Sequence, residues 1–127
     1  SRFKVQAELA AVCKQMGIAS EEELYDCVIT GGIAPQRGEL GTISELAAKP
    51  HPWLYAEAAQ SGLGLSASDY PKVIGLDDSA AGVVALRLAG FDVIGMDGGN
   101  IAASGVAPLV RKNCRCLMDA LPIILGE

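Results

Sequence analysis

The chain has 127 residues, of which 50% are hydrophobic, a mean hydropathy of +0.32 and a formal net charge of −5 at pH 7. This length and composition predict one folded domain with a hydrophobic core and exclude an intrinsically disordered chain. Lysine and arginine are scattered, so the chain lacks the basic stripe of a nucleic-acid-binding surface. No apolar run approaches the roughly 20 residues of a membrane span, and Ser1–Lys4 does not resemble a signal peptide. We expect a cytoplasmic protein that binds neither nucleic acid nor membrane.

The four cysteines indicate reduced thiols. Cys13 and Cys27 lie in apolar segments, where a cysteine acts as a small hydrophobic residue. Cys114 and Cys116 form a C-x-C pair with no second pair of ligands at zinc-site spacing. We therefore expect no zinc site.

In the first part of the chain, apolar residues recur at helical spacing from residue 2 to residue 16 and predict an amphipathic helix that ends at Gly17. Ser20 followed by three glutamates indicates a second helix start. This segment leads into a short apolar run over 27–30, which predicts a buried strand. The region 33–48 contains glycines and mixed charge and predicts a surface loop.

In the second part, prolines at the first turn open a predicted helix over 50–63. A β-type apolar run follows at 73–76. Ser79 is then a candidate N-cap for a helix over 80–89, and that helix carries a single charge, which is typical of a helix packed against a sheet.

Two further apolar runs predict a strand over 91–96 and a short edge strand over 116–121. Helices and strands alternate along the chain, which favours an α/β fold. We expect a Rossmann-like, doubly wound parallel sheet.

Asp77 and Asp78 are adjacent carboxylates at the end of the 73–76 strand. The carboxyl ends of parallel strands are where an α/β sheet places its chemistry. Burying two unpaired carboxylates costs several kcal/mol or forces them to take up protons. A bound cation removes that cost, and oxygen ligands favour Mg²⁺.

Two segments together resemble the haloacid-dehalogenase-like phosphohydrolases, in the phosphoglycolate-phosphatase-like branch. Lys49-Pro-His-Pro-Trp-Leu-Tyr55 is similar to that family's third signature motif, and Val73-Ile-Gly-Leu-Asp-Asp-Ser-Ala-Ala-Gly82 to its fourth. The resemblance covers nearly the whole chain. It implies a Mg²⁺-dependent hydrolase of small phosphorylated metabolites that works through an aspartyl-phosphate intermediate.

The resemblance also implies roles for individual residues. Lys49 would pair with the nucleophile and with the transferring phosphoryl group. Asp78, helped by Asp77, would hold Mg²⁺. Three further candidates are a phosphate-binding Ser1 and two residues that would support the metal ligands, Asp97 and Asn100. His51 is interpreted as a loop residue that helps to start the helix, because a single histidine there gives no catalytic pattern.

The chain departs from the family in its first motif. Asp-x-Asp, which supplies the nucleophile and the acid/base aspartate, is absent from the sequence, and the second motif would fall at or just before residue 1. The resemblance then makes 1–127 the C-terminal part of one core domain, with the N-terminal strands and cap missing. Two strands would be missing between the 27–30 and 73–76 strands. Since unpaired strand edges invite pairing, we expect the chain to be inactive alone and to work beside an N-terminal half or a self-paired copy.

Several alternatives stay open. Without a cap, phosphatase, mutase and dehalogenase chemistry are not distinguished, and the substrate is not identified. A non-catalytic interaction or regulatory module derived from the same fold is the main alternative to an enzyme. A nucleotide-binding Rossmann-like domain is a weaker one, since the glycines near 30–32 and 95–99 lack the G-x-G-x-x-G spacing.

Overall fold

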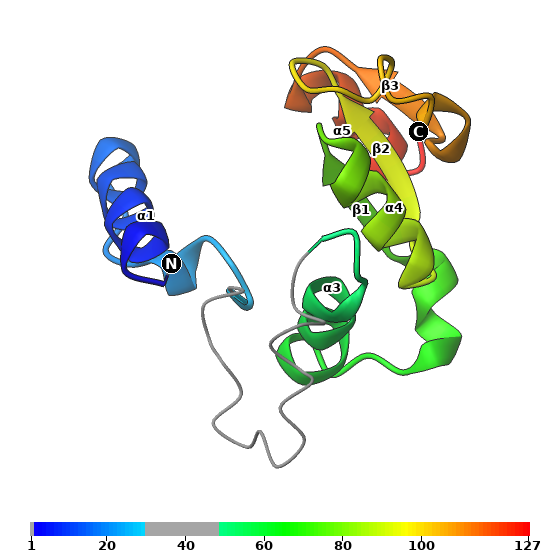
Figure 1. The fold of residues 1–127 in the computed structure, drawn as a ribbon. Coiled ribbons are helices and arrows are strands. Elements are labelled where there is room, and N and C mark those ends of the chain that lie inside the picture. Colours follow the sequence, from blue (N-terminus) through cyan, green and yellow to red (C-terminus); the bar gives the residue numbers. More distant parts are fainter. Residues whose placement is uncertain (1, 30–48) are drawn as a thin grey trace.

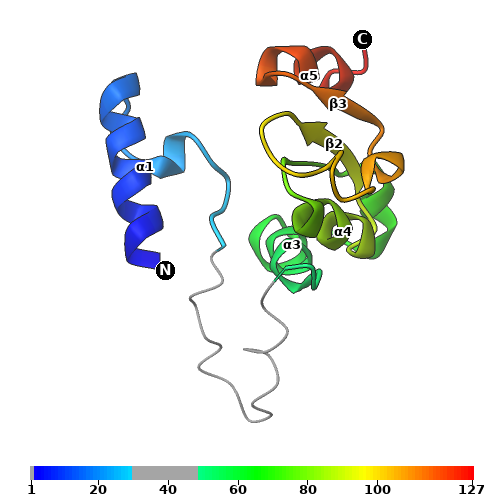
Figure 2. The same ribbon diagram turned by 45° about the horizontal axis from the view of Figure 1, so that its top comes forward.

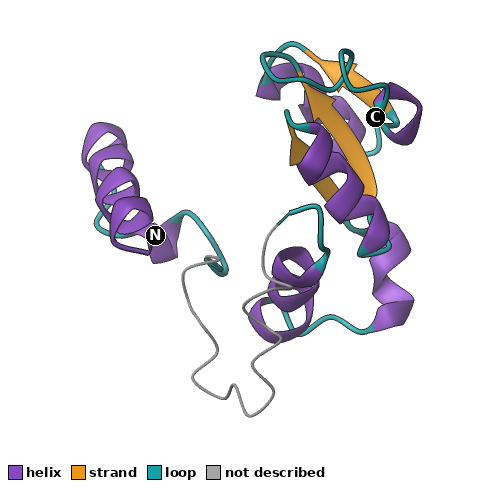
Figure 3. Ribbon diagram, in the orientation of Figure 1, coloured by secondary structure: helices purple, strands orange, loops and turns teal. Residues whose placement is uncertain are grey.

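The structure is a computed structural model that describes residues 2–29 and 49–127 (Figure 1). It is a mixed α/β fold in which helices flank a small parallel sheet (Figure 3). The helices are α1 (Arg2–Met16), α3 (Trp53–Glu57), α4 (Ala80–Leu88) and α5 (Leu117–Ile124); short 3₁₀ or π-helical turns are η1 (Glu21–Glu23), η2 (Ala58–Gly62), η3 (Ala67–Lys72) and η4 (Ala107–Leu109); the strands are β1 (Ile74–Asp77), β2 (Asp92–Met96) and β3 (Lys112–Cys114).

The sheet has the strand order β1-β2-β3, and both pairings are parallel. Ile74 lies opposite Asp92, and Ile94 lies opposite Lys112. Helix α4 connects β1 to β2, as a parallel pair requires a crossover. The parallel pairing and the two apolar strands, β1 and β2, confirm the α/β fold with a parallel sheet that the sequence predicted.

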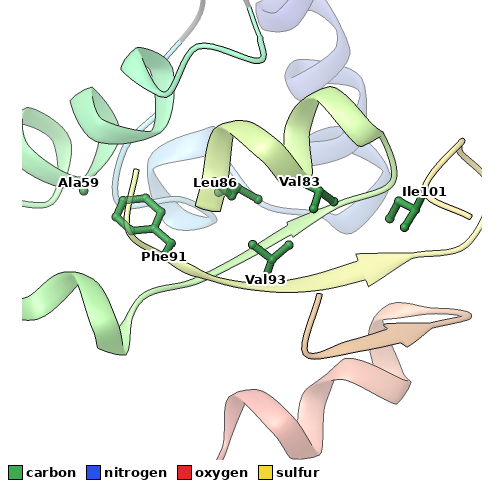
Figure 4. Packing of buried hydrophobic residues seen from close by; sticks show 6 residues of the cluster. All are labelled: Ala59, Val83, Leu86, Phe91, Val93 and Ile101. Carbon is green, nitrogen blue, oxygen red and sulfur yellow. The ribbon is translucent and has the colours of Figure 1, made fainter. Parts of the chain in front are cut away.

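The two faces of the sheet are covered by different helices. Val93 and Ile94 follow one another in β2, so their side chains point to opposite faces, and both are fully buried. Val93 packs in a cluster with residues of α4, while Ile94 packs with Cys114 and with Ala120 of α5. Figure 4 shows the cluster on the α4 side. Its buried members are Ala59, Val83, Leu86, Phe91, Val93 and Ile101.

Several predicted elements are confirmed with adjusted ends. Helix α1 ends before Gly17, whose φ of 73° is the left-handed conformation that glycine adopts without strain. The helix expected over 50–63 begins later, at Trp53, and finishes as the π-helical turn η2. The helix start at Ser20 gives only the 3₁₀ turn η1. The loop expected over 33–48 lies outside the described residues.

The strand predicted over 27–30 is wrong for Cys27–Ile29, which form no strand in the described structure; Thr30 lies outside it. A strand forms only when its backbone pairs with another strand, and these residues have no such partner among those described. Instead, the Cys27 thiol donates to the carbonyl of Ala58 at 3.8 Å. Cys27 therefore packs against η2 rather than joining the sheet.

The edge strand predicted over 116–121 is also wrong, because these residues belong to helix α5. The neighbouring position in the sheet is taken by β3, which sequence reasoning missed. Lys112 and Asn113 are polar and exposed, so this three-residue strand carries no apolar alternation. The run after Cys116 has helical rather than strand spacing: Ala120 faces the core, while Leu117 and Leu121 are exposed.

Among residues 2–29 and 49–127, no helix has both the length and the apolar character needed to cross a membrane.

The core on the α4 side gives a stability prediction. Leu86→Ala removes a side chain that is 2% exposed, and we expect a loss of about 2–5 kcal/mol in the free energy of unfolding. Leu88→Ala is the matched control, since Leu88 lies on the same helix but is 64% exposed, and its effect should stay within about 0.5 kcal/mol. Urea unfolding followed by Trp53 fluorescence measures both. Equal losses in the two variants would contradict the assignment of the core face.

Candidate functional site

The candidate site is built around Asp77, the last residue of β1 at the carboxyl end of the sheet. Its Oδ1 accepts hydrogen bonds from the backbone N–H of Ser79 at 2.8 Å and from the Ser79 hydroxyl at 2.7 Å. The same hydroxyl accepts from the N–H of Gly82 at 3.0 Å and so caps α4, as the sequence predicted. One serine thus fixes both the carboxylate and the first turn of the helix.

The other oxygen of Asp77 binds two side chains from a different part of the chain. Lys49 Nζ and the Tyr55 hydroxyl each lie 2.7 Å from Asp77 Oδ2. Tyr55 comes from α3, and Lys49 precedes that helix. The Lys49 ammonium also lies over the Tyr55 ring, 5.2 Å from its centroid. Four donors therefore surround a carboxylate whose side chain is 8% exposed.

These contacts decide the protonation states in the site. Burial raises the pKa of Asp77, but the hydrogen bonds from Lys49, Tyr55 and Ser79 outweigh it and hold this pKa at about 2. Burial lowers the pKa of Lys49, but the hydrogen bonds and charge interactions with Asp77 and Tyr55 together outweigh it, so the pKa is raised. Burial also raises the pKa of Tyr55. At neutral pH the site holds a carboxylate, an ammonium and a neutral phenol.

Glycine at position 82 makes room for the Asp77 carboxylate. A Cβ placed on Gly82 would overlap all three atoms of that carboxyl group. Gly82 is also buried within the first turn of α4. The helix backbone therefore comes close enough to Asp77 that only a residue without a side chain fits.

Asp78 is placed differently from its neighbour. It is exposed, and no described residue gives its carboxylate a hydrogen bond or an ion pair. The loop after β2 lies against its backbone, because a Cβ on Gly99 would overlap the carbonyl of Asp78. Asn100 Oδ1 accepts from the N–H of Ala80 at 2.7 Å. The loop after β2 thus contacts the turn that carries Asp78 at two adjacent residues, while the Asp78 side chain is exposed.

The other predicted residues are distributed as follows. Asp97 lies just beyond β2 and accepts a hydrogen bond from the side-chain amide of Asn113, so it is tied to β3. His51 Nδ1 accepts from the N–H of Trp53 at 3.1 Å, which confirms its interpretation as a residue that helps to start the helix. Ser1 lies outside the described residues. The structure therefore brings together Lys49 and Asp77, while Ser1 cannot be placed with them.

At the carboxyl end of the sheet, Asp78 offers a carboxylate that no donor among the described residues occupies. Mg²⁺ keeps several waters and is held by one or two carboxylates in phosphate-transfer sites. Asp78 is an exposed carboxylate of that kind. Both oxygens of Asp77 are already occupied, so a metal would have to displace Lys49 or Tyr55 to bind there. No group of three or more His, Cys, Asp or Glu side chains is assembled for a metal within the described parts of the chain.

Sequence reasoning missed the roles of Tyr55 and Gly82. Tyr55 stands six residues after Lys49 in the quoted motif, but nothing in the sequence shows that its hydroxyl reaches the end of β1. Gly82 is an isolated glycine near a helix start, which is a weak signal for a close approach. A glycine inside an otherwise fully apolar helical turn was the available clue.

No family model, curated protein or solved structure matches the chain.

The buried carboxylate predicts a pH dependence of stability. A pKa held at about 2, below the ordinary 3.8, stabilises the folded state above pH 3.8, and this stabilisation is lost as the pH falls toward 2. At about 1.4 kcal/mol per pKa unit this stabilisation amounts to roughly 2 to 3 kcal/mol. In the unaltered chain, the free energy of unfolding should be larger at neutral pH than at acid pH, in part because of Asp77. We expect Asp77→Asn to reduce this difference by the amount given above, measured by denaturant titration at each pH. Asp78→Asn, one residue away and exposed, should retain it.

The shared role of Ser79 gives a second prediction. Ser79→Ala removes the cap of α4 and one hydrogen bond to Asp77, and we expect a loss of about 1–2 kcal/mol. Ser61→Ala, at an exposed position in η2, is the control and should change stability by less than about 0.5 kcal/mol. Thermal or urea unfolding compares them. A neutral result for Ser79→Ala would show that its hydroxyl stabilises neither the helix nor the carboxylate.

Proposed function

We propose that the chain is the C-terminal portion of a Mg²⁺-dependent phosphohydrolase with a Rossmann-like, haloacid-dehalogenase-like core. Its substrates would be small phosphorylated metabolites. The single observation that supports this most is the pairing of the Lys49 ammonium with Asp77 at the carboxyl end of β1, next to the exposed Asp78. A fixed cation beside a free carboxylate is what a site for a phosphate ester and its metal requires.

Lys49 would serve as the positive charge that meets the phosphoryl group. A lysine ammonium is a compact point charge with three donors, suited to phosphate oxygens. Asp77 accepts one of its three N–H groups, which leaves donors for an incoming anion. The side chain of Lys49 is 35% exposed, so an anion can reach it.

Asp78 would hold the metal. Mg²⁺, when bound, neutralises negative charge that develops on the transferring group and lets an acidic protein accept an anionic substrate. Asn100 and the loop at Gly99 fix the backbone of the Asp78 turn, so the carboxylate is presented from a constrained position. Asp97, tied to Asn113, would support the same edge of the site.

The nucleophile would come from outside these 127 residues, since the sequence holds no Asp-x-Asp. An aspartate oxygen would attack phosphorus and expel the alcohol of the ester. Water would then hydrolyse the aspartyl phosphate, releasing inorganic phosphate and restoring the carboxylate. Strand β1 pairs with β2 alone among the described strands, so its other edge can receive a parallel strand that ends beside Lys49.

A non-catalytic interaction module is the second candidate. It is favoured by the cluster at Asp77, in which four donors from the protein itself satisfy one carboxylate. In that case the contact between Lys49 and Asp77 would only hold the segment before α3 against the sheet. A partner would then be recognised elsewhere, and Mg²⁺ would have no effect.

The decisive experiment begins with native and denaturing mass spectrometry of the protein purified from its own cells. We expect a second polypeptide, or a preceding segment, that carries Asp-x-Asp. The assembled protein should hydrolyse p-nitrophenyl phosphate only when Mg²⁺ is present, while the 127-residue chain alone should be inactive. An assembly that contains Asp-x-Asp and yet shows no Mg²⁺-dependent hydrolysis would favour the interaction module.

Variants of the assembled protein test the residue roles. Lys49→Met and Asp78→Ala should each lower kcat by about a hundredfold or more, as expected when a charge that stabilises the transition state is removed. Lys72→Met and Asp26→Ala remove the same charges at exposed positions of η3 and of the segment after η1, and should leave kcat unchanged. Activity that survives Asp78→Ala with the same dependence on Mg²⁺ would show that another group holds the metal.

A further inference from the structure

We infer that Tyr55 is the positioning residue for Lys49: its hydroxyl and its ring together hold the lysine ammonium at the end of β1. This inference rests on the proposed function for the use of that ammonium, while the contacts themselves are independent of it. Tyr55 has no role in the sequence-based assignment of the site.

The hydroxyl of Tyr55 and the ammonium of Lys49 share one acceptor. Both lie 2.7 Å from Asp77 Oδ2, so the phenol restrains the oxygen to which the ammonium binds. The remaining oxygen is fixed by Ser79, so rotation of the carboxyl group would break bonds at both ends. The tyrosine hydroxyl therefore keeps the lysine's anchor from turning away.

The ring of Tyr55 acts on the ammonium directly. Lys49 Nζ is 5.2 Å from the ring centroid, within the range in which the face of an aromatic ring attracts a cation. The lysine is thus held by a carboxylate on one side and an aromatic face on another. A lysine stem has four flexible bonds, so without a second contact the ammonium would sample many positions.

The position of Tyr55 in the chain makes this arrangement possible. Lys49 precedes α3 and Tyr55 lies in its first turn, whose start is fixed by the bond from the Trp53 N–H to His51. The residue that supplies the charge and the residue that orients it therefore move as one local unit. That unit meets the sheet through Asp77.

Competitive lysine labelling followed by mass spectrometry tests the inference without substrate or metal, so its result does not depend on finding phosphatase activity. The chain is treated with a small amount of a reagent that acylates lysine amines, so that the lysines compete for it. The extent of modification of Lys49 is then compared with that of Lys4, Lys14, Lys72 and Lys112 in the same sample. We expect Tyr55→Phe to raise the relative labelling rate of Lys49 about threefold, in line with a more mobile and less well anchored ammonium. The other four lysines should not change.

Tyr25→Phe is the matched control, because Tyr25 is 46% exposed and the cation–π contact of Lys49 is with Tyr55. It should leave all five labelling rates unchanged. A Tyr55→Phe variant that labels Lys49 at the unaltered rate would overturn the inference. A uniform rise at every lysine would show that Tyr55 only stabilises the fold, and would overturn it as well.

An NMR measurement on the unaltered chain covers the case in which Tyr55→Phe does not fold. The ring protons of Tyr55 should give nuclear Overhauser effects to the ε-CH₂ protons of Lys49, and the ring should shift those protons upfield. The ε-CH₂ protons of Lys72 serve as the reference. Lys49 resonances that coincide with those of Lys72, without any effect from Tyr55, would overturn the inference.

Discussion

The arrangement at the carboxyl end of the sheet depends on one constraint: the Asp77 carboxylate is almost completely removed from water and stays ionised. An ion in that position needs donors on every side. The protein supplies them from two separate segments, the turn at Ser79 and the stretch from Lys49 to Tyr55. The Asp77 carboxylate therefore connects α3, β1 and α4. Both the packing of these elements and the position of Lys49 depend on it.

Parallel pairing explains why these groups meet. In a parallel sheet every strand ends at the same edge, so the turns after β1 and β2 become neighbours, although Ala80 and Asn100, which join them, are 20 residues apart. In Figure 2, α4 lies on one side of β2 and α5 on the other. The contacts of Asn100 with Ala80 and of Gly99 with Asp78 are consequences of that geometry. Val93 and Ile94 pack into the clusters on the two faces of the sheet, so the strand that leads to this edge is buried on both faces.

The parts of the fold that sequence reasoning predicted are those whose signal is local. The strands at β1 and β2, the cap at Ser79 and helix α4 each follow from apolar pattern or from capping chemistry. The errors occurred where tertiary packing decides the outcome. The apolar pattern after Cys27 predicted a strand, but these residues have no described strand to pair with. Strand β3 is polar, so its sequence lacks the alternation of apolar and polar residues that predicts a strand. Tyr55 was missed for the same reason, since its partner is 22 residues away.

Position 82 carries a further consequence. The carboxylate of Asp77 fits only because α4 has no side chain at position 82. A single methyl group at this position would overlap the carboxylate and displace it. In a related turn with two adjacent aspartates, a larger residue at the position of Gly82 would force the first aspartate into a different position. The combination of a lysine, two adjacent aspartates, a capping serine and this glycine is therefore a more selective criterion for finding distant relatives than either motif alone, because it encodes a shape as well as a set of charges.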